Sequence, residues 1–369
     1  MNRMKLGEIL SVKHGWAFKG EYFAEDGEQS ILTPGNFFEK GGFKPNNGKE
    51  RYYTGTYPKE YLCHKGDLIV AMTQQAEGLL GSTALVPENN KYLHNQRIGL
   101  ITCDEKRLNK LFAYYLFMTK SVREQLERSS SGTKVKHTSP EKIYDVEVEI
   151  PDVISQQKIA NLLWSVDEKI ANNKAINDNL EQQMHLIFEN MMAKVANHKL
   201  SGEYTIAQNL TTVVTGKEDA NFSVPNGKYK FFTCSNTPLL CDDYVFDSSS
   251  ILIAGNGNFN VKHYSGKFNA YQRTYVLTPD KKYFGLLYLA SLYRINSFKS
   301  RSSGSIVKFI TKSDVENIPV FIPNDVFYLQ ELNKLIYLQE QNKLENELLV
   351  NLRDWLLPML MNGQATIGD

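Results

Sequence analysis

The sequence predicts an α+β protein with an internal pseudo-two-fold repeat, in which two mixed β/α domains are separated by two long antiparallel coiled-coil helices. Two stretches, 151–192 and 329–357, carry apolar residues at alternating steps of three and four, which is typical of long helices that pack along another helix. The segments 132–151 and 304–323 also align without gaps at a spacing of 172 residues. A fixed period of this kind indicates two copies of one structural unit.

The length of the chain favours two domains over one. The chain has 369 residues, whereas a single hydrophobic core seldom grows beyond about 250–300 residues. We expect each domain to be followed by a helical spacer. The predicted boundaries of domain, spacer, domain and spacer are 1–150, 151–198, 199–322 and 323–369.

Composition limits the compartment and the kinds of site. No apolar run is long enough to cross a bilayer, and the N-terminus lacks the apolar core of a signal peptide. We therefore expect a cytoplasmic protein without membrane contact. The four cysteines include no C-x-x-C pair and are expected to be free, mostly buried thiols. The histidines show no spacing that suggests a metal site.

The net charge of +1 hides a division along the chain. Counting Lys and Arg against Asp and Glu, residues 1–150 carry +2 and residues 199–322 carry +5, whereas the spacers 151–198 and 323–369 carry −2 and −4. Affinity for nucleic acid depends on neutralising its phosphates, so a nucleic-acid partner would be bound by the positively charged domains. The acidic spacers would be left for contacts with proteins.

The first domain is predicted to consist of short strands and loops followed by one helix. After a short helix or strand around 6–10, residues 14–43 are rich in glycine, aromatic and turn-forming residues and have no helical period. The remaining predicted elements are strands at 67–72, 82–86, 97–102 and 144–150, a polar loop at 73–78, a helix at 108–127 and a flexible loop at 128–132.

The second domain repeats this order. The sequence SSSILIAGNGNF corresponds to KGDLIVAMTQQ as a strand that runs into a polar loop, and AYQRTYVLTPD corresponds to HNQRIGLITCD. This alignment places Gln272 and Arg273 opposite Gln96 and Arg97. A helix and a loop follow in YFGLLYLASLYRINSFKSRSSGS, as in the first half.

The two spacers have matching apolar ends and polar middles. The first seam comprises Leu163, Val166, Ile170, Asn173, Asn177, Leu180, Met184, Ile187 and Met191, and the second comprises Leu335, Leu338, Asn342, Glu345, Leu349, Leu352 and Leu356. This match predicts antiparallel pairing, and buried asparagine commonly fixes the register of a coiled coil. Pro358 is expected to end the second helix. The alternative is that either helix is an ordinary amphipathic helix of its own domain.

The junction IPDVISQQKIANLLWSVDEKIANN and the tail LRDWLLPMLMNGQ resemble the DNA-specificity subunit of type I restriction–modification systems. The P-x-x-x-x-Q-Q-K-I-A pattern at 151–160 is the most specific part, and the second junction, PNDVFYLQELNKLI, departs from it. The resemblance covers essentially the whole chain. It implies two target-recognition domains, each followed by a helical spacer.

The resemblance also implies partners. A subunit of this kind has no catalytic activity of its own and assembles with two adenine-N6 methyltransferase (M) subunits and, for cleavage, a motor–nuclease (R) subunit. It implies that this chain binds no cofactor, with S-adenosylmethionine in the M subunits and ATP and Mg in the motor subunit. The spacers would bind the M subunits, and Trp164 or Trp355, if exposed, would belong to that surface.

Double-stranded DNA is the expected ligand of the two domains. Two-fold symmetric proteins read two half-sites about one helical turn or a multiple of it apart, so two different domains would read an asymmetric bipartite site. Base edges are recognised mainly by Arg, Lys, Asn and Gln on loops that a rigid sheet supports. The candidates in the first domain are Thr73, Gln74, Gln75, Asn95, Gln96, Arg97, Lys134 and Lys136. Those in the second are Asn256, Asn258, Asn260, Lys262, Tyr271, Gln272, Arg273, Ser303, Ser305 and Lys308.

Motifs for catalysis are weak. An S-adenosylmethionine site requires a glycine-rich turn that leads into a helix, but the G-x-G at 254–259 is not followed by a helical pattern. Residues 317–320 resemble an N-P-P-Y tetrad but lack its aromatic residue. A loose P-D…D-x-K pattern places Asp152 and Asp167 more than roughly 20 Å apart on a helix, too far to share a metal. Asp167 and Lys169 are better interpreted as solvated charges. We predict no catalytic residue and no metal site; the alternatives are a coiled-coil protein-interaction scaffold and, less favoured, a stand-alone adenine methyltransferase.

Overall fold

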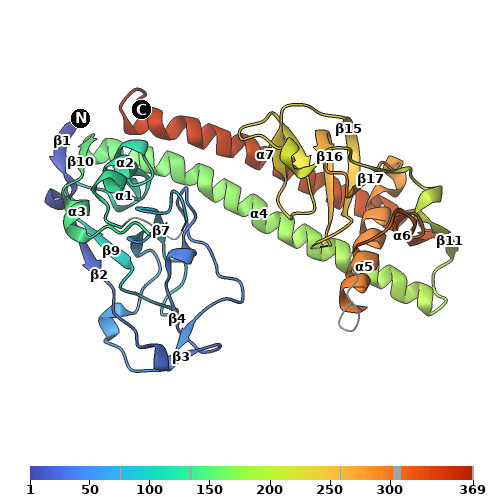
Figure 1. Ribbon diagram of the computed structural model, residues 1–369, viewed down its shortest axis with the longest axis horizontal. Coiled ribbons are helices and arrows are strands. Elements are labelled where there is room, and N and C mark those ends of the chain that lie inside the picture. Colours follow the sequence, from blue (N-terminus) through green and yellow to red (C-terminus); the bar gives the residue numbers. More distant parts are fainter. Residues whose placement is uncertain (75, 133–134, 258, 302–308, 368–369) are drawn as a thin grey trace. The chain divides into compact units, whose positions relative to one another are not determined.

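The computed structural model describes residues 1–74, 76–132, 135–257, 259–301 and 309–367. Two compact units divide the chain: unit 1 comprises Met1–Lys169 with Leu349–Asp369, and unit 2 comprises Ile170–Leu348. Each unit contains one β/α domain and a segment of each long helix, α4 (Val153–Ala196) and α7 (Val326–Met361), as labelled in Figure 1. The predicted α+β class is confirmed, and each unit includes parts of both predicted spacers.

Unit 1 contains short strands in three sheets. Its strands are β1 (Asn2–Lys5), β2 (Leu10–His14), β3 (Phe23–Ala24), β4 (Ser30–Ile31), β5 (Tyr52–Tyr53), β6 (Leu68–Ala71), β7 (Thr83–Leu85), β8 (Tyr92–Leu93), β9 (Ile98–Cys103) and β10 (Glu147–Ile150). The main sheet has the order β2-β9-β6-β7, a smaller sheet has the order β3-β5-β4-β8, and β1 pairs with β10. The strands predicted at 67–72, 82–86 and 97–102 are confirmed as β6, β7 and β9.

The helix predicted at 108–127 is interrupted. The structure has two helices here, α1 (Lys110–Leu116) and α2 (Lys120–Ser129). Thr119 caps α2, because its side-chain oxygen accepts a hydrogen bond from the backbone N–H of Val122. Threonine favours such a capping position over a helix interior, which explains why a continuous apolar pattern does not give a continuous helix.

The strand predicted at 144–150 is also shorter than expected. Its first residue, Tyr144, is the last residue of the helix α3 (Pro140–Tyr144), and β10 begins only at Glu147. Ser139 caps α3 and a proline follows it, which is a typical start for a short helix. At the beginning of the chain, a 3-10 helix at Leu6–Glu8 separates β1 from β2.

The core of unit 1 lies between its main sheet, α1 and segments of both long helices. Phe112 and Tyr115 of α1 are buried together with Leu163 of α4 and Leu360 of α7. Burial of each such side chain contributes about 1.5–3 kcal/mol. The β/α domain of unit 1 is therefore fixed to both helix segments of that unit.

Unit 2 is built on a six-stranded sheet with the order β12-β17-β15-β16-β13-β14, and β11 pairs separately with β18. Its strands are β11 (Gly202–Ile206), β12 (Val213–Thr215), β13 (Tyr229–Phe232), β14 (Leu239–Cys241), β15 (Phe246–Ala254), β16 (Val261–Ala270), β17 (Thr274–Leu277) and β18 (Pro319–Pro323). Its shorter helices are α5 (Phe284–Arg301) and α6 (Lys312–Glu316). The strands β15, β16 and β17 lie side by side in Figure 1.

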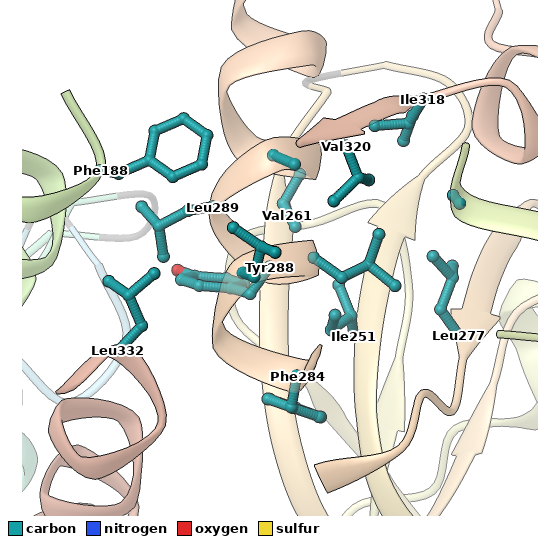
Figure 2. Packing of buried hydrophobic residues seen from close by; sticks show 14 of the residues in the cluster. Phe188, Ile251, Val261, Leu277, Phe284, Tyr288, Leu289, Ile318, Val320 and Leu332 are labelled. Atoms are coloured by element: carbon teal, nitrogen blue, oxygen red, sulfur yellow. The ribbon is translucent and has the colours of Figure 1, made fainter. Parts of the chain in front are cut away.

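The core of unit 2 joins this sheet to three helices. Figure 2 shows α5, with Tyr288 and Leu289, between the strands that carry residues such as Ile251 and the helices that carry Phe188 and Leu332. All five side chains are buried. The sheet of unit 2 is therefore supported from behind by α5, which itself packs on α4 and α7.

The two units repeat one plan. The helix α6 begins 172 residues after α3, at Lys312 and Pro140, and each is followed by a strand that leads into a long helix. That strand pairs antiparallel with the first strand of its unit, so β1 pairs with β10 and β11 pairs with β18. Among the strands described, each unit also has one parallel pair, β4 with β8 and β13 with β16. The predicted internal repeat is confirmed.

Within unit 2 the long helices pair antiparallel through polar side chains. Asn173 donates to Glu345 at 2.7 Å and to Asn346 at 2.9 Å, and Asn342 donates to Asn177 at 2.9 Å. Partner numbers fall on α7 as they rise on α4, which fixes the antiparallel sense. The predicted seam of α4 is buried or half-buried along its length, and its asparagines pair with α7 as expected.

The predicted seam of α7 is wrong by one residue at two positions. Leu338 and Leu352 are 40% and 44% exposed, whereas the neighbouring Gln339 is 3% exposed and Arg353 is half-buried. The two polar side chains lie inward because each donates to a carboxylate of α4, at 3.0 Å and 2.8 Å. The leucines beside them face outward.

The predicted end of this helix at Pro358 is also wrong, because α7 continues to Met361. A proline inside a helix removes a backbone hydrogen bond and costs about 3 kcal/mol. The last turn places Leu360 and Met361 in the core of unit 1, each 3% exposed. Burial of two such side chains contributes about 3–6 kcal/mol, which offsets the cost of the proline.

Candidate nucleic-acid interface

An exposed Gln-Arg pair forms the corner of a β-turn in both units. In unit 1 the backbone N–H of Ile98 donates to the carbonyl of Asn95 at 2.9 Å, and in unit 2 that of Thr274 donates to Tyr271 at 2.8 Å. Each bond closes a four-residue turn. The first residues, Asn95 and Tyr271, are half-buried. The exposed central residues are Gln96, Arg97, Gln272 and Arg273.

A second chain segment holds each turn from behind. The N–H of Gln96 donates to the carbonyl of Trp16 at 3.1 Å, and the N–H of Gln272 donates to that of Glu218 at 2.8 Å. This segment contains Gly15 in unit 1 and Gly216 in unit 2. Glycine is required at both positions, because a Cβ would overlap the backbone beside the turn. The turn therefore recurs because its backbone is held in the same way in both units. The exposed Gln and Arg side chains take no part in these contacts.

His94 supports the turn of unit 1 from inside. It is buried, and its Nε2 lies 2.8 Å from the carbonyl of Ile98, which places a proton on Nε2. Burial lowers the pKa of His94 to about 4. The turn is therefore held rigidly, which reduces the entropy that its side chains lose on binding a ligand.

The ends of two neighbouring strands meet at each turn. In unit 1 the N–H of Met72, just after β6, donates to the carbonyl of Arg97 at 3.1 Å. In unit 2 the N–H of Gly255, just after β15, donates to the carbonyl of Arg273 at 2.8 Å. Among the described residues, the structure therefore brings the start of the segment after each strand and the turn to one edge of each sheet.

Several predicted residues of unit 1 already have partners at this edge. Thr73 is 4% exposed, and its hydroxyl forms a hydrogen bond with Nδ1 of His137 at 3.1 Å. Lys136 forms an ion pair with Glu127, so its charge is compensated. Gln74 is half-buried. The exposed turn residues of unit 1 are therefore better placed for a ligand than these side chains.

In unit 2 Asn260 and Lys262 hold a loop in place. Asn260 donates to the carbonyl of Cys234 at 2.9 Å, and Nζ of Lys262 donates to the carbonyls of residues 233 and 235, the former at 3.4 Å. Burial lowers the pKa of Lys262. The loop residues 235–237 are exposed, so the loop is more accessible to a ligand than the two side chains beneath it.

Asn256 is half-buried and forms a β-bridge with Phe309. The remaining predicted residues lie outside the described part of the chain, and they are Gln75, Lys134, Asn258, Ser303, Ser305 and Lys308.

A cavity beside the turn of unit 1 was not predicted. It has a volume of about 410 Å³, and its lining includes Gln96, Arg97, Asn46, Lys49 and Arg51. The run KPNNGKER contains the last three, but no motif or period in the sequence places this loop beside the turn. The exposed loop 235–237 of unit 2 gave no signal either, because its short polar sequence is typical of any turn.

Comparison with known proteins identifies the family of this fold and site. Residues 1–182 and 212–349 match the family described as type I restriction modification DNA specificity domain. The chain belongs to this specificity family.

Several members of the specificity family are similar to the chain. The EcoDI specificity subunit of Escherichia coli is 36% identical over 164 residues, which cover 42% of this chain and 37% of that protein. The MjaIX specificity subunit of Methanocaldococcus jannaschii is 24% identical over 303 residues, covering 70% and 69%. The matches to EcoDI and to the MjaVIII subunit of M. jannaschii span about two fifths of those relatives, 37% and 42%. The crystal structure of the S subunit from M. genitalium shares the fold, with a TM-score of 0.63, 18% identity and coverage of 98% and 96%.

In this member of the specificity family, the carboxylates of the loose nuclease pattern have structural roles. Asp152 accepts from the N–H of Ser155 at 3.0 Å at the start of α4, and this bond lowers the pKa of Asp152. Asp167 accepts from the hydroxyl of Tyr115 at 2.7 Å and from Arg353 at 2.8 Å. The expectation that Asp167 is a solvated charge is wrong, because α1 and α7 enclose its carboxylate.

Other chemistry is limited among the described residues. The four cysteines are free thiols as predicted, and burial raises the pKa of Cys63 and Cys103 to about 12. Within the described ranges, no three His, Cys, Asp or Glu side chains come together as a metal site. The segment with the G-x-G lies between the strands β15 and β16 and does not start a helix. Among the helices described, none combines the length and the apolar character needed to cross a membrane.

Proposed function

We propose that this chain is the DNA sequence-recognition subunit of a type I restriction–modification complex. Membership of the specificity family supports the proposal, and one observation carries it: both units present an exposed Gln-Arg turn at the same edge of a sheet. In the major groove, arginine donates bidentately to guanine and glutamine pairs bidentately with adenine. Each such pair discriminates against the wrong base by about 1–3 kcal/mol.

The proposed target is bipartite and asymmetric. The repeated turn gives each domain one reading edge, whereas the surroundings of the turn differ between the units. Lys49 and Arg51 lie beside it in unit 1, and the exposed loop 235–237 is held near it in unit 2. Different neighbours select different bases around the shared pair, so the two half-sites have different sequences.

The outward face of α7 is the proposed docking surface for methyltransferase subunits. Tyr337, Leu344 and Leu348 of unit 2 are 62%, 53% and 61% exposed, and spacings of seven and four residues place them on one helix face. In unit 1, Trp355 is exposed and Trp164 is half-buried. Contiguous exposed apolar side chains mark protein interfaces.

In this proposal the chemistry belongs to the partners. Two M subunits with S-adenosylmethionine methylate adenine, and the R subunit, with ATP and Mg, joins through the assembled complex in the cytoplasm. The chain itself contributes recognition and assembly. The two carboxylates of the loose nuclease pattern support this division. Asp152 caps a helix and Asp167 forms an ion pair with Arg353.

The test is the adenine methylation pattern of the host genome, read by single-molecule sequencing with and without this gene. Deletion is expected to erase one motif of two short halves around a fixed gap. Replacing residues 199–322 with the second domain of a relative is expected to change one half only. If no split motif depends on the gene in a strain with an active partner methyltransferase, the proposal fails and a scaffold role takes its place.

Point variants assign each half to a turn. Gln96→Ala is expected to relax base choice in one half of the motif, and Gln272→Ala in the other, because each removes one bidentate reader. Lys106→Ala is the matched control, since this exposed lysine follows β9 at the end opposite the turn. Relaxation of the same half by both glutamine variants would contradict the assignment of one half-site to each domain.

A further inference from the structure

The cavity beside the turn of unit 1 is cationic. Lys49, Arg51 and Arg97 contribute to its lining together with Phe18 and Phe23. No aspartate or glutamate is among the described residues that line it. Within the described part of the chain, none of its three cations is paired with a carboxylate. An anionic ligand would therefore meet uncompensated positive charge.

The loop that carries Lys49 and Arg51 is anchored at both ends. The N–H of Lys44 donates to the carbonyl of Asn36 at 2.8 Å, and the buried amide of Asn36 donates back to the carbonyl of Lys44 at 3.2 Å. At the other end the carbonyl of Arg51 accepts from the N–H of Ile31 at 2.8 Å. The backbone that carries the two cations is therefore held in place before a ligand arrives.

The acidic residue between these cations is engaged elsewhere. Glu50 accepts a hydrogen bond from the backbone N–H of Gly48 at 2.7 Å, within the same loop. Its carboxylate is therefore turned to the backbone, and Glu50 does not line the cavity. Lys49 and Arg51 keep their charge available despite an acidic neighbour in the sequence.

Aromatic rings form a firm wall of the cavity. Phe18 lies edge-on against the buried Tyr53 with 4.8 Å between ring centroids, and Phe23 lies 6.2 Å from the same ring. A small inorganic anion would gain no favourable contact from these apolar rings. Phenyl rings do pack against apolar parts of a nucleotide, which include the carbon atoms of its sugar.

We propose that this cavity holds the sugar–phosphate backbone of the first DNA half-site, so that affinity and base choice are separable within one domain. This inference rests on the proposed function. Lys49 and Arg51 neutralise phosphates, whereas Gln96 and Arg97, which line the same cavity from the turn, contact base edges. Half to two thirds of protein–DNA hydrogen bonds go to phosphate and sugar, where they orient the protein without reading sequence.

Unit 2 is built differently near its own turn. There, the ammonium of Lys262 already donates hydrogen bonds to the backbone carbonyls of the loop residues Thr233 and Ser235. Cys234 of this loop contacts the carbonyl of Arg273. Lys262 is therefore less available to a phosphate than Lys49 and Arg51, which line the cavity of unit 1.

The test uses the full chain assembled with its methyltransferase subunits. One duplex carries the motif found by the methylation experiment, and a second carries the same motif with the first half scrambled. Binding to both is measured over a range of about 50 to about 300 mM potassium chloride, because the slope of log affinity against log salt counts the phosphates that are neutralised.

Replacing both Lys49→Ala and Arg51→Ala is expected to reduce the steepness of this slope by about 1.8, since each phosphate contact contributes about 0.9. Affinity for both duplexes is expected to fall by the same factor, which leaves their ratio unchanged. Gln96→Ala is expected to do the reverse, with an unchanged slope and a smaller ratio. Lys106→Ala is expected to change neither. Thermal unfolding of all variants should match the wild type, because these side chains are exposed.

The outcomes separate the two proposals. An unchanged salt slope in the double variant, with motif-dependent binding by the wild type, overturns the cavity assignment and leaves DNA recognition standing. A smaller ratio without a change in slope overturns it as well, because the cavity would then read bases. Absence of motif-dependent binding by the wild-type complex overturns both.

Discussion

His94 makes the stability of unit 1 depend on pH. Its ring is buried directly before the Gln96–Arg97 turn, and its Nε2 donates to the carbonyl of Ile98 at 2.8 Å. The pKa of His94 is lowered to about 4, mainly by burial; nearby Lys13 and His14 also lower it, and the hydrogen bond to Ile98 and the charge of Asp67 oppose the shift. The folded protein therefore keeps this ring neutral under mildly acidic conditions.

The sign of the effect follows from proton binding. An unfolded histidine has a pKa of about 6.5, so between about pH 6.5 and about pH 4 the unfolded chain binds a proton that the folded unit does not. The contribution is fully present above about pH 6.5 and is lost as the pH falls toward about 4. A difference of about 2.5 pKa units corresponds to about 3 kcal/mol of unfolding free energy.

The assay is urea unfolding followed by tryptophan fluorescence. Trp16, Trp164 and Trp355 all belong to unit 1, so the signal reports this unit. The wild type and His94→Gln are compared at several pH values between about 7 and about 4, because a glutamine amide can donate to Ile98 without titrating in this range. The wild type is expected to lose about 3 kcal/mol more than the variant.

His64→Gln is the control, since His64 is exposed in the same unit and its removal is expected to leave the wild-type pH dependence in place. Parallel curves for the wild type and His94→Gln, within about 0.5 kcal/mol at every pH, would refute the reasoning. They would show that the ring does not stay neutral in the folded unit.

Two further perturbations test unit 1. Asp167→Ala is expected to lower its unfolding free energy by about 2–4 kcal/mol, because Arg353 loses a largely buried partner; a loss below about 1 kcal/mol in the fluorescence assay would contradict this. Gly15→Ala is expected to displace the turn, since the new Cβ overlaps the carbonyl of Asn95, and so to weaken motif binding in the salt titration. Gly20→Ala, where a Cβ meets open space, is the control, and equal binding by both variants would show that the turn tolerates displacement.

The repeat was predictable because it is a property of order and spacing. Pairs such as α3 with α6 and β10 with β18 keep their distance of 172 residues, so an alignment of the chain with itself finds them without any knowledge of packing. The correspondence of Gln96 and Arg97 with Gln272 and Arg273 followed from the same alignment, but the turn that each pair forms did not. The structure adds the reason for its recurrence, which is a closed turn held by a glycine-containing segment in each unit.

The partners of individual polar side chains were not predictable in this way. Lys262 looks like a phosphate ligand in the sequence, yet its ammonium is bound by carbonyls about 30 residues earlier in the chain. Thr73 likewise meets His137 across the sheet edge. Such contacts depend on which loops a fold brings together, and one sequence contains no period that reports it.

The seam of α7 shows how a hydrophobic pattern can indicate the wrong face. Leucine at position 338 fits a heptad better than glutamine at 339, yet Gln339 is inside because Glu181 and the carbonyl of Asn177 would otherwise lack its amide as a partner. A buried polar group without a partner costs about 1–3 kcal/mol, comparable with the gain from burying a leucine. The helix therefore turns its polar residues toward α4 and leaves apolar ones outside. The same rotation that makes the heptad prediction wrong exposes Tyr337, Leu344 and Leu348 in one row, which is the surface proposed above for docking a methyltransferase subunit.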